Sequence, residues 1–173
     1  MKTSQFTISL IGTLIMIYVM QVTGAPLKGA ETPLGILNLE FAYNAQLADL
    51  VTNAWKQQNV LEDAIYNTAL DFIFLGCYSI LLFSICSYIS KKSIGMLRKM
   101  GSGFGIAVLI AGGLDILKNL GMLITLSGAI DDSIALMTVI FSILKWVLVL
   151  TVIVFVLIAG PIAFFRKNQL ENS

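Results

Sequence analysis

The sequence predicts an all-α protein: an integral membrane four-helix bundle with a short outer amphipathic helix between helices 1 and 2. Of its 173 residues, 57% are hydrophobic and only 12% are charged, about half the charged share of a soluble domain. Four apolar runs are long enough to cross a bilayer. Basic residues gather in the short connections beside them. We expect one membrane domain over residues 1–173.

The composition also limits the chemistry. A net charge of +1 argues against nucleic acid as a partner. The chain has no histidine, which excludes imidazole chemistry and His-ligated metal sites. We expect neither a metal nor a cofactor. Cys77 and Cys86 lie nine residues apart on one predicted helix, therefore on opposite faces, and we interpret them as packing residues that do not pair within that helix.

The four predicted spans cover residues 6–22, 69–90, 103–128 and 134–165. A bilayer core needs about 20 helical residues. Because the fourth run is longer, we expect it to tilt strongly or to extend past the bilayer. Gly160 and Pro161 near its end favour a kink or a termination there.

The first span has an alternative interpretation. Lys2 at its start, and Thr23 and Ala25 after it, also fit a secretory signal peptide with its cleavage site. The apolar run is long for a signal peptide, so we favour a retained helix. Cleavage would leave three spans and would not change the other predictions.

Positive charge predicts the orientation. Lys91, Lys92, Arg98 and Lys99 fill the connection between the second and third spans, and basic residues also precede the first span and follow the fourth. By the positive-inside rule, both termini and the 91–99 connection are expected to be cytoplasmic. The segment 24–66 and the turn 129–133 then face outward.

The outer segment 24–66 is the only large part expected outside the bilayer. Residues 35–43 alternate in polarity and fit a short extended piece. A helix with an apolar stripe is expected from its N-cap Asn44, with Trp55 at the membrane–water interface. Asn59 and Glu62 resemble a capping box that starts a helix running into the second span. The segment is either a surface helix over the bundle end or a lid on a cavity.

Four ionisable residues lie inside the spans. Counted from the cytoplasmic charges, Asp71, Lys118 and Lys145 each lie about 30 Å along their helix, and Asp115 lies about 24 Å along. Three helices thus bring buried charges to one level in the outer half of the bilayer. Because such groups are costly in lipid, we expect Asp115 and Lys118 to face inward and to meet Lys145 and Asp71.

Three interpretations of this cluster remain open at the level of sequence: an ionic clasp that fixes helix register, a functional site, or lysines that snorkel outward. Glu40 lies in an apolar piece that can fold onto the outer mouth, and its carboxylate would make the cluster net acidic, which favours a cationic or polar ligand. Tyr43, Tyr66, Tyr78 and Trp146 can line such a site, although aromatic residues there are more often packing or interface residues. The candidate ligand-binding residues are Glu40, Asp71, Tyr78, Asp115, Lys118, Asn119 and Lys145.

Glycines in the third span have a packing interpretation. Gly101 and Gly105 form a GxxxG pair that lets helices approach closely. "GSGFG" is no dinucleotide fingerprint, because no strand precedes it. Gly112 and Gly113, just before Asp115, permit a local bend.

The run "GILNLEFAYNAQLADLVTNAW", followed by "LDFIFLGCYSILL", resembles an uncharacterised family of small bacterial four-helix membrane proteins with an "LEFA…W…LDxxFLxxY" pattern. The match covers Gly35 to Leu82. The resemblance implies an architecture, a bacterial inner (cytoplasmic) membrane and four pattern positions, Glu40, Trp55, Asp71 and Tyr78. It implies no activity.

Three classes of function follow. The first is a binding or accessory module, not an enzyme, that holds a small polar or amphipathic ligand or serves a partner membrane subunit. The second is a small homo-oligomeric transporter that uses the cluster for a coupling ion or polar substrate, which a discontinuous helix at "AGGLD" would support. The third is an enzyme acting on lipid, with Glu40 and Asp71 as acid and base. It has the least support, because no nucleophile motif or metal-ligand set is present.

Overall fold

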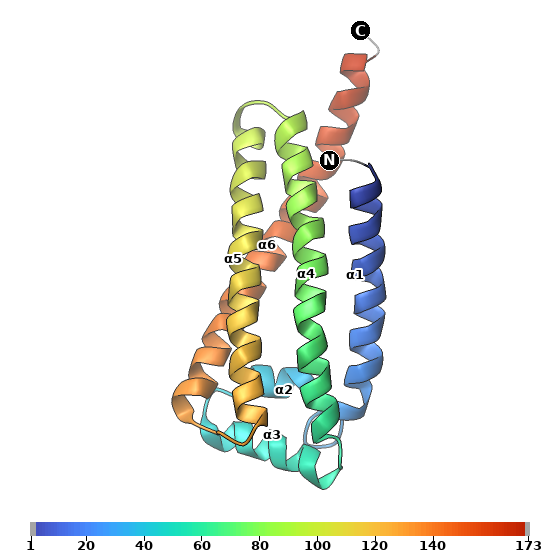
Figure 1. Cartoon of the computed structure of the whole chain (residues 1–173). Helices are drawn as coiled ribbons and strands as arrows, with labels where there is room; N and C mark the ends of the chain where they lie inside the picture. The colour runs from blue at the N-terminus through green and yellow to red at the C-terminus, as the bar shows by residue number, and fades with distance from the viewer. Residues whose placement is uncertain (1–2, 172–173) are drawn as a thin grey trace.

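In a computed structural model of the chain, residues 3–171 are described, with side chains from residue 6 to residue 163. The elements in chain order are α1 (Thr3–Gly24), the 3-10 turn η1 (Ala25–Leu27), α2 (Ile36–Glu40), α3 (Ala45–Gln57), α4 (Leu61–Lys92), α5 (Gly95–Leu126) and α6 (Asp132–Glu171). All of them are helical. The long helices α1, α4, α5 and α6 form a bundle, and α2 and α3 close one end of it (Figure 1).

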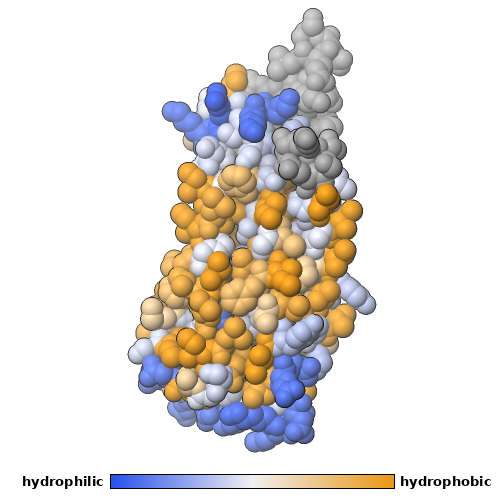
Figure 2. Space-filling view, in the orientation of Figure 1, coloured by the Kyte–Doolittle hydropathy of each residue, from blue (hydrophilic) through white to orange (hydrophobic). Residues whose placement is uncertain are grey.

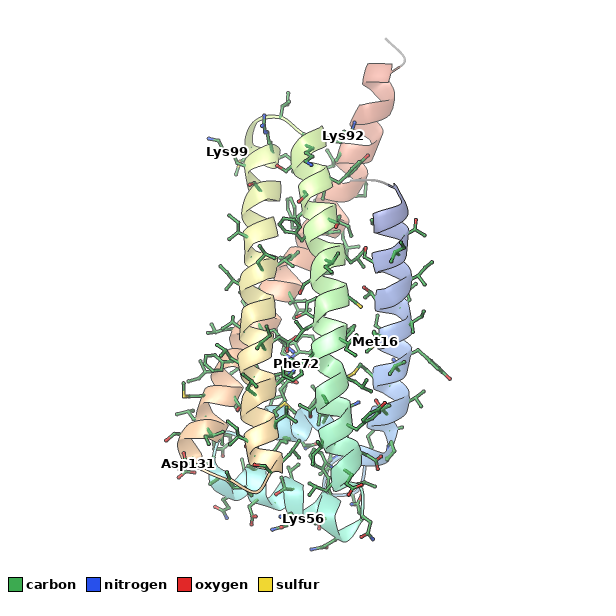
Figure 3. The ribbon with its side chains drawn as sticks, in the orientation of Figure 1. Met16, Lys56, Phe72, Lys92, Lys99 and Asp131 are labelled. Carbon is green, nitrogen blue, oxygen red and sulfur yellow. The ribbon has the colours of Figure 1, made fainter. Side chains whose placement is uncertain are left out.

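The four long helices are each apolar and long enough to cross a membrane, which confirms the predicted class of integral membrane helical bundle. Figure 2 shows a hydrophobic belt between two hydrophilic ends. We call the end covered by α2 and α3 the cap end. The other, with Lys92 and Lys99 at the α4–α5 connection, is the basic end (Figure 3). The start of α1 and the end of α6 also lie at the basic end (Figure 1).

Small residues set the spacing of the spanning helices. A Cβ on Gly101 of α5 would lie 2.8 Å from the Ser90 backbone nitrogen of α4, and one on Gly105 would lie 3.5 Å from the Phe83 ring. The GxxxG pair therefore lets α5 pack directly on α4, as the sequence predicts. Gly121 packs in the same way against Thr138 of α6, where no room is left for a methyl group.

The cap is held by its own apolar core. Leu27 and Trp55 are fully buried there together with Leu39, Ala48 and Val51. The Trp55 indole Nε1 donates to the Leu27 carbonyl oxygen at 3.0 Å. Trp55 is therefore a core residue of the cap, and its ring is not exposed as the ring of an interface anchor would be. The expected N-cap is confirmed, because the Asn44 side chain accepts from the Leu47 amide at 2.8 Å.

Two local predictions for the outer segment are wrong. Residues 36–40 are helical instead of extended, because Ile36, Leu39 and Glu40 recur at helical spacing and all turn toward the bundle. Asn59 does not cap α4. It has a left-handed φ of 58°, and the Val60 amide donates to the Trp55 carbonyl oxygen at 2.9 Å. This geometry ends α3, and α4 then begins at Leu61 and runs on through the second span as expected.

Helix α6 continues through Pro161 to Glu171, so of the kink or termination predicted at Gly160–Pro161 the termination does not occur. At 40 residues, α6 is long enough to extend past a bilayer, about 60 Å at 1.5 Å per residue. Likewise α5 is one unbroken helix across Gly112 and Gly113. The discontinuous helix that would favour a transporter is absent from the described part of α5.

Candidate functional site

Five ionisable side chains from four helices meet beneath the cap. They are Glu40 of α2, Asp71 of α4, Asp115 and Lys118 of α5, and Lys145 of α6. Taken as whole residues, none of the five is more than 9% exposed. The expectation that three spans bring opposite charges to one level is confirmed, and Glu40 joins them from the cap.

Four of these groups form a closed ring of alternating charge. The Lys118 ammonium lies 3.4 Å from Glu40 Oε2 and 3.0 Å from Asp115 Oδ1. Lys145 closes the ring, with its Nζ 3.3 Å from Glu40 Oε1 and 3.1 Å from Asp115 Oδ1. The ring is neutral because it holds two ammoniums and two carboxylates, and within it each group touches two groups of opposite charge. It joins α2, α5 and α6, whereas the clasp expected from the sequence had Asp71 in the place that Glu40 takes.

Asp71 lies outside this ring. Its Oδ2 accepts from Lys118 Nζ at 2.9 Å and from Asn119 Nδ2 at 3.0 Å. Its Oδ1 accepts no hydrogen bond from the described residues. The Asp71 side chain is 12% exposed, the most open of the five. Asp71 is thus a pendant carboxylate that links α4 to the ring through Lys118.

Two aromatic donors complete the polar cluster. The Tyr78 hydroxyl of α4 donates to Asp115 Oδ2 at 2.7 Å, and the Trp146 indole Nε1 of α6 donates to Glu40 Oε1 at 2.8 Å. The Lys145 ammonium also lies 4.6 Å from the centre of the Trp146 ring, a cation–π distance. Each ring carboxylate therefore has a neutral donor in addition to its lysines, as a buried charge requires.

The cluster forms the polar end of a cavity of about 400 Å³. Side chains of α1, α4 and α6 surround it, α5 contributes charged residues, and α2 lies over its cap end. Along α4 the lining runs from Asn67 to Leu82, about 22 Å at 1.5 Å per residue. Away from the cluster the walls are almost entirely apolar, with Ile17, Leu81, Leu82, Val149 and Ile153. The cavity thus has one charged end and one apolar end.

The first helix forms one wall of this cavity. It packs chiefly against α4, where Asn67 Nδ2 donates to the Met20 carbonyl oxygen at 3.2 Å and to Thr23 Oγ1 at 2.7 Å. Thr13, Ile17 and Met20 of α1 face the cavity opposite α6. The cavity therefore lies between α1 and α6, two helices without extensive mutual packing.

All seven candidate residues from the sequence line this cavity: Glu40, Asp71, Tyr78, Asp115, Lys118, Asn119 and Lys145. The snorkelling alternative is wrong, because both lysines are buried and paired. Of the four aromatic residues considered for the walls, Tyr78 and Trp146 line the cavity, whereas Tyr43 and Tyr66 are each 60% exposed.

Asn67 and Thr68 also line the cavity and were not expected from the sequence. Asn67 lies one helical turn before Asp71 and therefore on the same helix face. That spacing was the signal in the sequence that Asn67 belongs to the site. Both are fully or almost fully buried. Asn67 Oδ1 and Asn119 Oδ1 are buried with no hydrogen-bond partner among the described residues. Two buried amide oxygens without a hydrogen-bond donor therefore belong to residues next to Asp71 in the cavity lining.

The carboxylates are committed to lysines, which limits other chemistry. Over the part of the chain whose side chains are described, no three His, Cys, Asp or Glu side chains are arranged to hold a metal ion. Glu40 and Asp71 both contact the Lys118 ammonium, at 3.4 and 2.9 Å. Both carboxylates are therefore engaged by the same lysine.

Comparison with known proteins found no matching family model, no similar curated protein and no similar solved structure.

Proposed function

We propose that the protein is a membrane-embedded binding module that holds a small amphipathic molecule in this cavity. The ligand's polar head lies at the charged cluster and its apolar part lies along α1, α4 and α6. The observation that carries the proposal is the cavity itself: about 400 Å³, charged at one end and apolar over the rest. Ligand sites typically combine apolar walls with a few convergent polar groups in this way.

A purely structural clasp accounts for the ring but not for the space beside it. Glu40, Lys118, Asp115 and Lys145 satisfy one another through direct contacts. A tight clasp needs no neighbouring void, and protein interiors are normally closely packed. Asp71 and Asn119 border the void and keep unused acceptor oxygens there. The cluster thus combines a clasp with a recognition surface.

The route into the cavity supports a ligand that partitions into the bilayer. At the cap end the way from water is closed by α2, whose Glu40 is bound by both lysines, and by the core around Leu27 and Trp55. On the lateral side α1 packs chiefly on α4. An amphipathic molecule in the membrane enters between α1 and α6 without unfolding the cap.

We further propose that the basic end faces the cytoplasm of a bacterial inner membrane and the cap faces outward. Lys91, Lys92, Arg98 and Lys99 at the α4–α5 connection support this orientation. An alkaline phosphatase or a fluorescent protein fused after Ser173 tests it. Fluorescence without phosphatase activity is expected, and the reverse result contradicts it.

The binding function is tested by filling the cavity. Val149 of α6 lines the cavity, whereas Val147 on the same helix does not and is 57% exposed. Val149→Trp should block the ligand, and Val147→Trp is the matched control. Native mass spectrometry of wild type and both variants released from membranes reports bound small molecules. We expect a ligand on wild type and Val147→Trp that is absent from Val149→Trp. An equal ligand signal in all three proteins contradicts the proposal.

The transporter alternative uses the same cluster. A transporter would require several copies of the chain to associate, because four helices are few for alternating access. The unbroken α5 gives the transporter alternative no added support. The same mass spectra report any homo-oligomer or partner subunit. Reconstituted vesicles that show gradient-dependent flux blocked by Val149→Trp would favour the transporter over a binding module.

A further inference from the structure

We infer that the head group bound in the cavity is a primary ammonium, so that the ligand is an amphipathic amine. This inference rests on the proposed binding function and adds the chemical class of the ligand. It follows from the charge balance of the cluster and from the type of hydrogen-bonding group left unused around Asp71.

The charge balance has a surplus of one negative charge. Three carboxylates, Glu40, Asp71 and Asp115, meet two ammoniums, Lys118 and Lys145. The closed ring is neutral, so the surplus belongs to the pendant Asp71. A net charge at this depth is costly in a low-dielectric bundle, and a bound cation beside it removes that cost.

The unused groups around Asp71 are all acceptors. Asn67 Oδ1 and Asn119 Oδ1 are buried without a partner, and both residues are 0% exposed and line the cavity. Asp71 Oδ1 accepts no hydrogen bond from the described residues, and its side chain is the most open of the cluster. A ligand that satisfies these oxygens must donate hydrogen bonds, and a primary ammonium carries three donors.

Other head groups fit less well. A carboxylate or phosphate needs donors, but the Lys118 ammonium already contacts three carboxylates and Lys145 contacts two. An anion would also lie beside the surplus charge of Asp71. A quaternary ammonium supplies the positive charge without any donor for the three oxygens. A hydroxyl supplies one donor without the charge.

Four probes with a straight chain of twelve carbons separate these cases: dodecylamine, dodecyltrimethylammonium, dodecanol and dodecanoate. Their binding to the full chain in nanodiscs is measured by native mass spectrometry in competition. We expect dodecylamine to bind with one-to-one stoichiometry and at least about tenfold more tightly than the other three, because it alone combines a positive charge with hydrogen-bond donors for Asp71. Binding of a different probe as tightly as dodecylamine overturns the inference but leaves the binding function standing. Binding of no probe overturns both.

Asp71→Asn then tests the position of the head group. This variant removes the surplus charge and leaves the alternating ring intact, and Asp63→Asn on the exposed first turn of α4 is the matched control. We expect Asp71→Asn to lose the preference for dodecylamine over dodecanol and Asp63→Asn to keep it. A preference that survives in folded Asp71→Asn overturns the inference. If that variant does not fold, the probe series on the wild-type chain still decides.

Discussion

Asp115 on α5 and Lys145 on α6 lie 30 residues apart in the chain, with the Lys145 ammonium 3.1 Å from Asp115 Oδ1. The same oxygen lies 3.0 Å from Lys118, one helical turn along α5. One carboxylate oxygen thus joins two lysines from two helices inside an apolar bundle. Because neither partner reaches water, the loss of one charge should lower the stability of the whole bundle.

Asp115→Asn should lower the free energy of unfolding by about 3 kcal/mol, the lower part of the range for breaking a buried ion pair. The amide removes the negative charge shared by Lys118 and Lys145, although both lysines keep Glu40. Thermal unfolding of detergent-purified protein measures the change. The exposed Asp63→Asn on α4 is the control and should be neutral. Equal melting of Asp115→Asn and wild type would mean that the ring is not a clasp.

Glu40→Gln should loosen the cap. The glutamine can still accept from Trp146 but loses its charge against Lys118 and Lys145, which are the ionic links between α2 and the spanning helices. Hydrogen–deuterium exchange should therefore rise at the backbone amides of residues 35–43 and stay unchanged in α5. Glu62→Gln, exposed in the first turn of α4, is the matched control. Unchanged exchange in residues 35–43 of Glu40→Gln would show that apolar packing alone holds the cap.

Gly121→Ala should destabilise the bundle by about 1–3 kcal/mol, the usual cost of overpacking. A Cβ there would collide with Thr138 of α6. Gly113→Ala on the same helix is the control, because nothing lies within 4 Å of its added Cβ. That control should be neutral or stabilising by up to about 1 kcal/mol through helix propensity. Similar unfolding temperatures for the two variants would contradict the close α5–α6 packing.

The turn before α6 should show a pH-dependent contribution to stability. The Ser133 and Ile134 backbone amides donate to the Asp131 carboxylate and lower its pKa below the ordinary value. A lowered pKa stabilises the fold above the ordinary Asp value of about 3.9, and this contribution is lost as the pH falls through the folded-state pKa. The melting difference between wild type and Asp131→Ala should therefore be larger at neutral pH than at acidic pH. A difference independent of pH would contradict this role of the carboxylate.

The mature chain should retain α1, because this helix forms a wall of the cavity and binds Asn67 through Met20 and Thr23. Intact-mass measurement of protein extracted from its native membrane checks this directly. A mass that includes residues 3–24 is expected. A mass that lacks them would support the signal-peptide alternative and would leave the cavity open on that side.

Much of the candidate site follows from sequence because a charged side chain in an apolar bundle must turn inward and pair with an opposite charge. Asp71, Asp115, Lys118 and Lys145 interrupt apolar runs, so their burial, common depth and pairing follow from the cost of charge in lipid. Which lysine meets which carboxylate does not follow, because it depends on helix rotation. Glu40 was a weaker prediction, since its place depends on how the cap folds.

The failures have local physical causes. The alternation at Ile36, Asn38 and Glu40 suggested a strand. The structure instead turns Ile36, Leu39 and Glu40, at helical spacing, toward the cap core and the cavity. Asn59 suggested an N-cap, yet asparagine also tolerates the left-handed conformation that ends α3. Asn67 is neutral and lies near the start of an apolar run, so only its spacing of four residues from Asp71 marked it as part of a cavity.

The most direct measurement is photo-crosslinking with an alkylamine that carries a diazirine in its chain, followed by peptide mapping of the labelled full-length protein in nanodiscs. The proposal puts the head at Asp71 and the chain along the apolar walls, so labels should fall on cavity residues such as Leu82, Val149 and Ile153. Excess dodecylamine should remove them. Labels confined to outward-facing residues such as Val147 and Ile143, and not displaced by dodecylamine, would contradict a ligand in the cavity.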